Sequence, residues 1–549
     1  MIRIPHQSFS VLITVVAFLV VTLANAHEEE IRADASLPPL ILGVLDFPNS
    51  GANGAQEPFV RGVMLLHSFE FEDARSAFLE AQNTDPGFAM AIWGEAMTLN
   101  HPLWAQQDRD EALEVLAKLP PRGATHITER EGRYLDAVNT LFGEGSKSQR
   151  DQRYMELMRD IYESYPEDLD AAAFYALSIL GAVYERDFRA YMKAAAILEE
   201  VFATQPKHPG AAHYLIHCYD DQVHAPLGLR AAREYNKIAP GASHAQHMVS
   251  HIYTSLGRWD EVVVANQIAV RVSEESMQRA GKPIANRNKH SLHWLQYGLL
   301  QQGRLDEARD AMLIMRDDLM TVPNLVHQRH SVLMRASYIA EDPTGEQVLV
   351  AVAEASMPLD DHAIDTFASG YRYLAMGDQQ SALAELAALE DRISGAKVLS
   401  VEEGLHEDDS ATSEDGYNIA TILSRELQAV IQFRAGDTDG AVILLAAAAS
   451  DENARPLEYG PPYVPKPCSE LLGEMLLTLD RPGEAIVHFQ QALERNTGRT
   501  LSLIGLARAQ EAAGDPAANE TWQRAVSNWQ GDEAALRQTK YSWLRGSQG

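Results

Sequence analysis

Five segments of the chain repeat one pattern of small and bulky residues, and this repetition limits the fold more than any other feature. The segments are residues 62–86, 250–269, 370–389, 473–493 and 507–525. Each has a small residue, a turn residue seven positions later, and then small or aliphatic and bulky residues at helical spacing. In the first segment these are Gly62, Phe69, Ala74, Phe78 and Ala81. Apolar residues that recur at i and i+3 or i+4 are typical of helices that bury one face. The pattern therefore predicts a helix–turn–helix unit used several times.

Glycine marks the turn in many of these units. Gly257, Gly303, Gly377, Gly436 and Gly514 all lie where the first helix must end and the chain must turn back. Glycine readily adopts the left-handed backbone conformation that ends many helices. Small residues at the contacts between the two helices let them approach closely. We therefore expect antiparallel helix hairpins, and no sheet, over most of the chain.

This arrangement resembles the tetratricopeptide repeat (TPR) family, whose fold is a right-handed superhelix of antiparallel helix pairs. The resemblance covers most of residues 58–530 and implies an all-α, TPR-type solenoid in which the first helix of each pair lines a concave groove. Parts of the chain are also similar to an exported bacterial TPR group of unassigned activity. The segments that carry this similarity are WGEAMTLNHPLW, HPGAAHYLIHCYDD, HAQHMVSHIYTSLGRWDEV and PPYVPKPCSELLGEMLL. Such arrays host many activities, so the resemblance indicates a fold and leaves the function open.

Composition shifts divide the chain into segments. We expect a signal peptide over 1–26, an extended segment over 27–57, a first helical array over 58–350, further helical repeats over 360–448 with an acidic loop at 400–416, a proline-rich connector over 456–467, and C-terminal repeats with a cap over 468–549. The connector holds five prolines in twelve residues, so it cannot form a helix.

The first 26 residues predict export. A single early arginine precedes an apolar run of 13 residues from Val11 to Leu23, and the sequence Ala-Asn-Ala at 24–26 matches a cleavage site. The run is too short to span a bilayer comfortably. We expect a periplasmic or secreted protein without stable membrane insertion after cleavage, and an uncleaved N-terminal anchor is the alternative.

Charge and motifs exclude several functions. The formal net charge is -31, which repels phosphate backbones, so we expect no nucleic-acid partner. With only Cys218 and Cys468, the chain has no disulfide framework. It lacks a GxSxG nucleophile elbow, a GxxxxGK[ST] loop and a GxGxxG turn after a strand, so we expect no nucleotide cofactor.

Histidine is concentrated in one part of the chain and follows the repeat period. Of the 19 histidines, 11 lie between residues 208 and 330. His213 and His247 are 34 residues apart, and so are His217 and His251, which is the TPR period. The histidines fall at helix positions that lie within an arc of roughly 60° on one helix face.

Imidazole is the commonest side-chain ligand for zinc, copper, nickel and iron. Two histidines at i and i+4 can reach one metal from one helix, and two such pairs on adjacent helices can offer up to four ligands. We therefore predict a site for zinc, copper or another divalent transition metal. Its candidate ligands are His213, His217, His244, His247, His251, His290 and His293.

Three functions stay open for this site. The first is an exported scaffold that binds a peptide, protein or small ligand in its groove, with the metal structural or part of recognition. The second is a metal-dependent hydrolase or oxidoreductase, with Glu95, Asp221 or Glu474 as candidate general base. The third is a metal-binding protein of the cell envelope. The adjacent Asp220 can equally act as a ligand or orient one. A groove of neutral imidazoles without metal is the bland alternative.

Overall fold

The computed structural model describes residues 40–121, 127–184, 186–350, 356–399, 412–537 and 542–545. The chain divides into two compact units, Met1–Leu40 and Ile41–Gly549, and all the described helices lie in the second. The predicted signal peptide at 1–26 and most of the predicted acidic loop at 400–416 fall outside the described residues.

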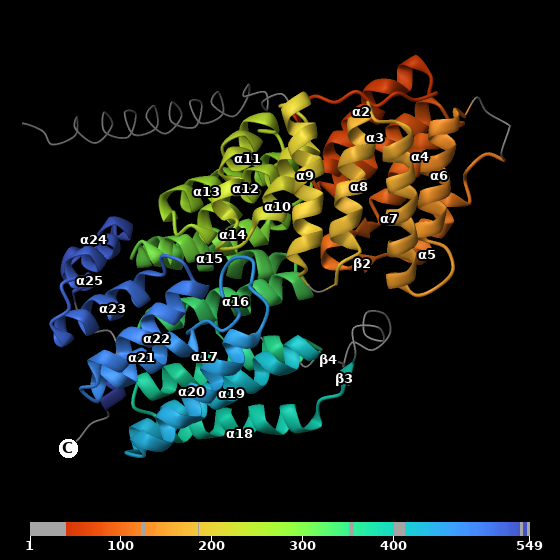
Figure 1. The fold of residues 1–549 in the computed structure, drawn as a ribbon. Coiled ribbons are helices and arrows are strands. Elements are labelled where there is room, and N and C mark those ends of the chain that lie inside the picture. Colours follow the sequence, from red (N-terminus) through yellow and green to blue (C-terminus); the bar gives the residue numbers. More distant parts are fainter. Residues whose placement is uncertain are drawn as a thin grey trace, which may run out of the picture. The chain divides into compact units, whose positions relative to one another are not determined.

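Helix hairpins follow one another from residue 56 to residue 341 (Figure 1). The helices are α2 (Gln56–His67), α3 (Phe71–Thr84), α4 (Ala89–Met97), α5 (Arg109–Leu116), α6 (Glu129–Leu141), α7 (Lys147–Ser164), α8 (Leu169–Gly181), α9 (Phe188–Thr204), α10 (Pro209–Tyr219), α11 (Ala225–Ile238), α12 (Ser243–Ser255), α13 (Trp259–Arg279), α14 (Lys289–Gln301), α15 (Leu305–Thr321) and α16 (Leu325–Glu341). Short 3-10 turns η1 (Asn53–Ala55), η2 (Pro102–Trp104) and η3 (Ile284–Asn286) and an antiparallel pair, β1 (Asn100–His101) and β2 (Gln106–Gln107), connect some of them.

A second series occupies the rest of the chain. It contains α17 (Leu359–Ala375), α18 (Gln379–Gly395), α19 (Glu414–Ala435), α20 (Thr438–Ala454), α21 (Cys468–Thr478), α22 (Pro482–Arg495), α23 (Thr500–Ala513), α24 (Ala518–Asn528), α25 (Glu533–Leu536) and η4 (Ser542–Arg545). Two parallel two-residue strands, β3 (Val398–Leu399) and β4 (Thr412–Ser413), precede α19. Residues 456–467, where the sequence predicts a connector, contain neither helix nor strand. The predicted all-α class and the helix–turn–helix organisation are confirmed.

The turns use the residues that the repeat pattern predicts. Gly257, Gly303 and Gly377 have φ angles of 66°, 68° and 86°, in the left-handed region. Phe69 occupies the equivalent place after α2 with a φ of 53°, although a bulky residue is strained there. The backbone of this hairpin therefore carries a cost that the glycine-containing hairpins avoid.

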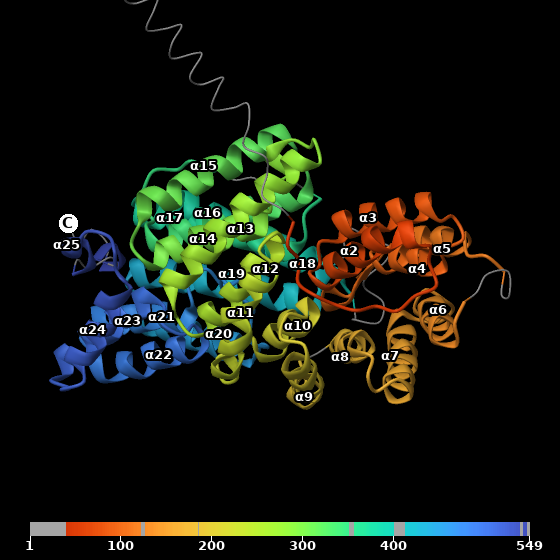
Figure 2. The same cartoon turned by 90° about the horizontal axis from the view of Figure 1, so that it is seen from above.

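The two helices of each pair differ in burial. In α10, ten of the eleven residues are buried, whereas the second helix, α11, buries only a stripe of six. A helix that is apolar on most sides lies inside an array, and an amphipathic helix covers it. Along the array α8 contacts α10, and α10 contacts α12. Figure 2 shows α8, α10, α12 and α14 in a row.

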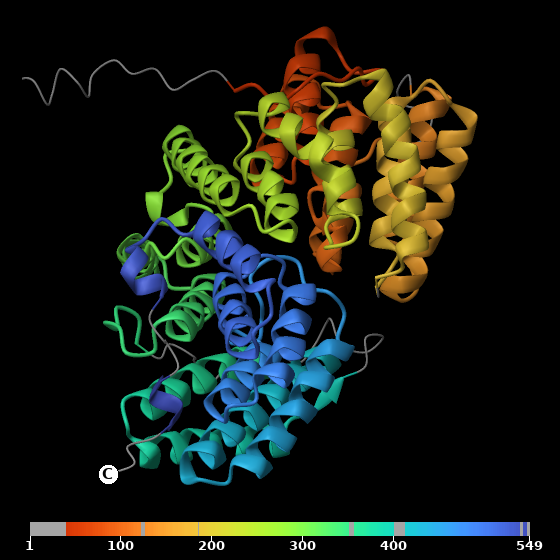
Figure 3. The same ribbon diagram turned by 60° about the vertical axis from the view of Figure 1, so that its left-hand side comes forward.

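The C-terminal repeats contact the middle of the first array. The indole Nε1 of Trp259 donates to the carbonyl oxygen of Gly498 (2.9 Å). The hydroxyl of Thr500 donates to the backbone carbonyl oxygen of Gln301 (2.7 Å). Figure 3 shows the C-terminal helices in blue beside the green helices of the middle region. None of the described helices is long and apolar enough to cross a membrane.

Candidate metal centre

Six of the seven predicted ligands come together as two groups of three. The first triad is His213, His217 and His244, and the second triad is His247, His251 and His290. Within each triad, one ring nitrogen from every histidine lies within 4.8 Å of the other two. Both triads follow one rule: two histidines at i and i+4 on the first helix of a hairpin are joined by a histidine from the start of the next first helix.

This pairing corrects one detail of the sequence interpretation. The two i, i+4 pairs do not share a single metal position, because each pair has its own third histidine. His293 belongs to neither triad. The reason lies in the residues at the equivalent positions one hairpin further on, which are Tyr297 and Asn324 and not histidines.

The nitrogen separations match the geometry of a metal site. In the first triad the Nε2 atom of His213 lies 3.1 Å from that of His217 and 3.2 Å from that of His244. A tetrahedral ion with metal–nitrogen bonds of 2.0–2.1 Å holds two ligand nitrogens about 3.3 Å apart. Two of the three separations in this triad are therefore close to those around one bound ion, and the third is at most 4.8 Å.

The second triad is similar. The Nε2 atoms of His247 and His251 are 3.1 Å apart. The ring of His290, at the start of α14, has its centroid 4.6 Å from that of His247 and 6.4 Å from that of His251. The triads thus draw on α10, α12 and α14, and α12 contributes to both.

Hydrogen bonds determine which ring nitrogen of His251 carries the proton. Its Nδ1 lies 2.6 Å from Oδ2 of Asp220, whose other oxygen accepts from the hydroxyl of Ser255 (3.1 Å). A carboxylate only accepts hydrogen bonds, so Nδ1 of His251 is the donor. The Nε2 atom of neutral His251 therefore presents a lone pair to the triad.

Hydrogen bonds also determine which ring nitrogen of His247 carries the proton. Its Nδ1 lies 2.7 Å from Oδ1 of Asn266 in α13. The amide of Asn266 is oriented by its Nδ2, which donates to the carbonyl oxygen of Val262 (2.9 Å). Nδ1 of His247 is therefore the donor, and its Nε2 is an acceptor. In the first triad, Nδ1 of His213 donates in the same way to the carbonyl oxygen of His67 (2.7 Å).

When His247 and His251 are both neutral, these contacts leave two lone pairs facing each other in the second triad. Neutral His247 and His251 both carry their proton on Nδ1, so neither can donate across the 3.1 Å between their Nε2 atoms. Metal-bound histidines usually donate their other ring nitrogen to a carboxylate, an amide or a backbone carbonyl, and all three types of acceptor occur here.

Burial favours the uncharged form of the imidazole at His213, His217, His244 and His247. His213 and His247 are 0% exposed, His217 and His244 are half-buried, and solvent reaches His290. Desolvation lowers the pKa of His213, His217, His244 and His247 well below the ordinary value. Neutral imidazole is the form that coordinates metal, and the exposed side at His290 gives an ion access.

Aromatic rings enclose the triads. The ring of Phe69 packs edge-on against His213 at 4.4 Å between centroids and also contacts His217 and His244. The ring of Trp294 lies 4.8 Å from His247 and 4.3 Å from His251. The strained turn at Phe69 therefore places a large apolar side chain against the first triad.

His67 belongs to a buried group of its own. Its Nε2 lies 2.9 Å from Asp170, its Nδ1 lies 2.9 Å from the hydroxyl of Tyr214, and His208 lies 3.4 Å from the same Asp170 oxygen. Burial raises the pKa of Asp170, but the hydrogen bonds from His208 and His67 outweigh it and hold this pKa below its usual range. Both ring nitrogens of His67 are engaged, so its contribution to the triads is its backbone carbonyl.

His293 lies beside the second triad. Its ring centroid is 5.7 Å from that of His330 in α16, and His330 is 5.6 Å from His290. Among the described residues, Nε2 of His293 and Nδ1 of His330 are buried and have no hydrogen-bond partner. The histidine cluster thus extends toward α16 without forming a third triad there.

The three candidate general bases lie elsewhere. Glu95 accepts from Gln82 (2.9 Å) and pairs with Lys118 (3.2 Å). Asp221 accepts from the backbone amides of Val223 and His224 at 2.8 and 2.9 Å. It also pairs with Arg186 (3.1 Å).

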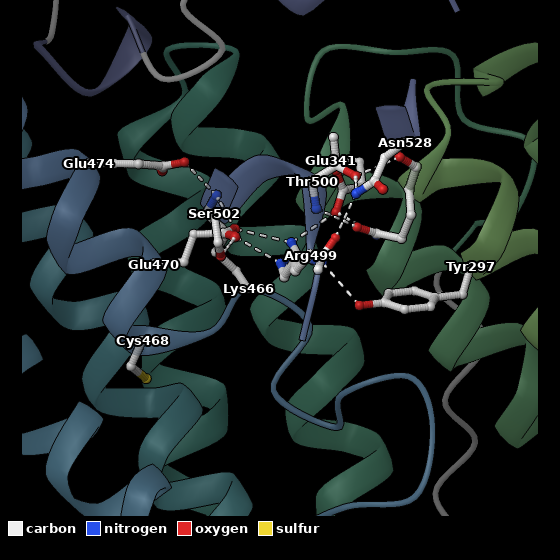
Figure 4. Close-up of polar contacts among 12 residues, drawn as sticks. Tyr297, Glu341, Lys466, Cys468, Glu470, Glu474, Arg499, Thr500, Ser502 and Asn528 are labelled. Carbon is white, nitrogen blue, oxygen red and sulfur yellow. Dashed lines mark hydrogen bonds and ion pairs between the residues drawn. The ribbon is translucent and has the colours of Figure 1, made fainter. Parts of the chain in front are cut away.

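Glu474 lies in a buried ionic network in the C-terminal repeats (Figure 4), 2.7 Å from Lys466. Burial raises its pKa. In the same network Lys466 and Arg499 both bind Glu470 at 2.8 Å. Among the described side chains, none of the three candidate bases contacts a triad histidine, which argues against the general-base role predicted for them.

Several supporting residues escape a sequence analysis centred on histidine. Asn266 offers a sequence signal, because it interrupts the apolar stripe of Val262, Ala269 and Val272 in the second helix, and the structure buries it fully. The carbonyl of His67 and the ring of Phe69 have no such signal, because they reach the first triad from about 146 residues away in the sequence.

No protein-family model matches the chain, and no curated protein matches its sequence. Solved structures with a similar fold include human IFIT1, determined as a dimer with m7Gppp-AAAA, at 12% identity over 88% of this chain and 91% of that chain (TM-score 0.35). Others are Cut9–Hcn1 of the APC/C (13%, 96% and 81%, TM-score 0.32) and yeast Tom70 (11%, 89% and 88%, TM-score 0.27). Likeness at this level does not extend to function or partners.

Proposed function

We propose that the protein binds transition-metal ions, zinc or copper, through its two histidine triads. The observation that carries this proposal is the convergence of ring nitrogens in each triad: in the second, the Nε2 atoms of His247 and His251 lie 3.1 Å apart while both Nδ1 atoms contact other acceptors. A metal ion between the two nitrogens would be coordinated by both, with His290 as the third ligand. The helical-repeat scaffold supplies first helices whose i and i+4 positions point the same way.

A metal-free cluster explains the arrangement less well. In the first triad, His213 can accept a hydrogen bond from His217 or His244, so that triad alone does not demand an ion. In the second triad, neutral His247 and His251 cannot hydrogen-bond to each other through their Nε2 atoms. Nine-tenths or more of buried polar groups in proteins have a partner, so a buried pair without one requires an explanation.

Export fits this function. The N-terminal pattern at 1–26 predicts that the mature chain works outside the cytoplasm, in the periplasm or the medium, where metal ions are met without cytoplasmic buffering. A metal-binding protein of the cell envelope is therefore the function that combines the triads with the predicted location.

A metal-dependent enzyme is the second candidate. Three protein ligands and an open position are typical of catalytic zinc, and solvent reaches the second triad at His290. A mostly apolar cavity of about 30 Å³ lies beside Phe69 and is lined also by Phe71, Phe174 and Leu177, so it has room for little more than a water molecule. The peptide-binding scaffold has no comparable feature in its favour among the described residues.

Elemental analysis tests the proposal. The purified full-length chain is dialysed against zinc or copper and then against metal-free buffer, and metal is counted per chain. We expect at least one tightly held ion, and the double variant His247→Ala, His251→Ala should lose the ion bound by the second triad. The control is His488→Ala, because this partly exposed histidine of α22 pairs with Gln491. Retention of less than a tenth of an ion by the wild-type chain, with circular dichroism showing it folded, contradicts the proposal.

A further inference from the structure

The two triads are not separated by a gap. The ring centroids of His217 and His251, which belong to different triads, are 6.1 Å apart, and so are those of His244 and His247. These separations are smaller than the 6.4 Å between His251 and His290 inside the second triad. The six imidazoles therefore form one continuous cluster.

Helix α12 joins the two triads covalently. His244 serves the first triad, whereas His247 and His251 serve the second, so three residues of backbone separate ligands to different ions. Such a helix is rigid, and its i and i+3 side chains lie on one face about one turn apart. The spacing between two bound ions is therefore set by this helix and not by a flexible loop.

Charge indicates what lies between the ions. Six neutral imidazoles leave two divalent ions with a total charge of +4. Two carboxylates of the described structure contact triad histidines: Asp220 is bound to Nδ1 of His251, and Glu70 accepts from the backbone amide of His244 at 2.8 Å. Neither contact involves an Nε2 atom, the atom that would face the ions. An anion between the ions lowers the uncompensated charge and can fill the coordination position that three ligands leave open.

Resting on the proposed metal binding, we infer that the two triads form one dinuclear centre, in which the two ions are bridged by a small oxygen anion such as hydroxide. Ions in dinuclear protein sites are typically about 3.5–4 Å apart. At that distance the unpaired electrons of two Cu²⁺ ions interact strongly, whereas ions in separate sites give independent signals.

Electron paramagnetic resonance of the copper-loaded protein distinguishes these cases. The full chain is titrated with Cu²⁺, bound copper is counted by elemental analysis, and the spin signal is integrated. We expect two Cu²⁺ ions per chain with a signal far below two spins, or a broadened signal with a half-field transition. Two ions with two independent spins, or only one ion, would overturn the dinuclear centre and leave metal binding intact. A chain that binds neither copper nor zinc contradicts the proposed function itself.

Single-triad variants provide the second readout. His217→Ala removes a half-buried ligand of the first triad, and His290→Ala removes the exposed ligand of the second, so both are expected to fold. We expect each variant to keep one ion and to show about one full, isolated spin. A variant that retains two ions and the coupled signal counts against the assignment of that histidine to the centre, and His488→Ala serves as the control with unchanged spectra.

Discussion

The imidazole of His251 donates from Nδ1 to Oδ2 of Asp220 across 2.6 Å, while the next residue, Asp221, binds Arg186 and the start of α11 instead. Two adjacent carboxylates thus have different roles, one toward the histidine cluster and one toward the scaffold. This neighbouring pair allows a matched test of how the second triad is held.

We expect Asp220→Asn to weaken metal binding about 10- to 100-fold, which is the usual effect of removing a group that orients a metal-bound histidine. The amide keeps the size of the side chain but lowers the basicity of His251 and places an N–H near Ser255 or His251. Isothermal titration with Zn²⁺ against a competing chelator measures the change.

Asp221→Asn is the control, because its carboxylate contacts the scaffold. It should lower the stability, through the weakened pairing with Arg186, and leave the zinc affinity within about twofold. An equal loss of affinity in both variants contradicts an orienting role specific to Asp220.

Much of the fold could be predicted from the sequence because helix hairpins are local. Gly257, Gly303 and Gly377 mark turns whose geometry depends on a few neighbouring residues, and the structure places all three in the left-handed region. Thr500 contacts Gln301, about 199 residues away in the sequence. This contact depends on the sum of the many small rotations between successive hairpins. No local pattern encodes that sum.

The sequence could predict which histidines lie near one another, but not which of them group into each triad. The spacing of 34 residues placed His213, His217, His247 and His251 on one side of successive helices. Which histidine completes each triad depends on the distance and offset between neighbouring first helices, which the spacing does not contain. Glu95 had the expected helix position, but the nearby Lys118 binds its carboxylate.

Phe69 supports a second prediction. Its φ angle of 53° is strained for any residue with a Cβ, and its ring packs on the first triad. At such a position glycine should be more stable than alanine, by about 1–2 kcal/mol, which is the opposite of their order in a helix. We therefore expect Phe69→Gly to be more stable than Phe69→Ala, although both lose about 3–5 kcal/mol relative to the wild type through the missing ring.

Urea unfolding midpoints compare the two variants. Gly514→Ala is the control for the backbone term, because Gly514 has a φ of 72° and an added Cβ there meets no atom within 4 Å. It should cost about 1–2 kcal/mol through the backbone conformation alone. If Phe69→Ala proves the more stable of the two Phe69 variants, the turn after α2 is not strained.

Gly210 supports a third prediction. A Cβ built on this residue of α10 lies 2.4 Å from Nδ1 of His67, whose carbonyl oxygen accepts from Nδ1 of His213. Gly210→Ala should displace His67, lower the stability by about 1–3 kcal/mol and weaken the first triad. Thermal unfolding with and without Cu²⁺ measures both effects.

Gly132→Ala in α6 is the matched control for that substitution. An added Cβ at Gly132 meets no atom within 4 Å, so the change should stabilise the helix by about 0.5–1 kcal/mol and leave copper binding unchanged. Unaltered copper binding in Gly210→Ala contradicts the link from His67 to His213.

The buried carboxylate of Glu470 supports a prediction about pH. Burial raises its pKa, but Arg499 and Lys466, both bound at 2.8 Å, outweigh that effect and hold the pKa below its ordinary value (Figure 4). The unfolded chain binds this proton at about pH 4.3. The ionised Glu470 therefore stabilises the fold fully above that pH, and the contribution falls as the pH is lowered toward the folded pKa.

We expect Glu470→Gln to cost about 3–5 kcal/mol at pH 7, because it leaves Arg499 and Lys466 with one buried partner fewer. The difference from the wild type should shrink between about pH 4 and pH 2. Urea unfolding at several pH values measures it. Glu484→Gln is the control: its surface pair with Arg481 should contribute about 0–1 kcal/mol. A difference between wild type and Glu470→Gln that stays constant from pH 7 to pH 2 means that Glu470 is not held ionised by Arg499 and Lys466.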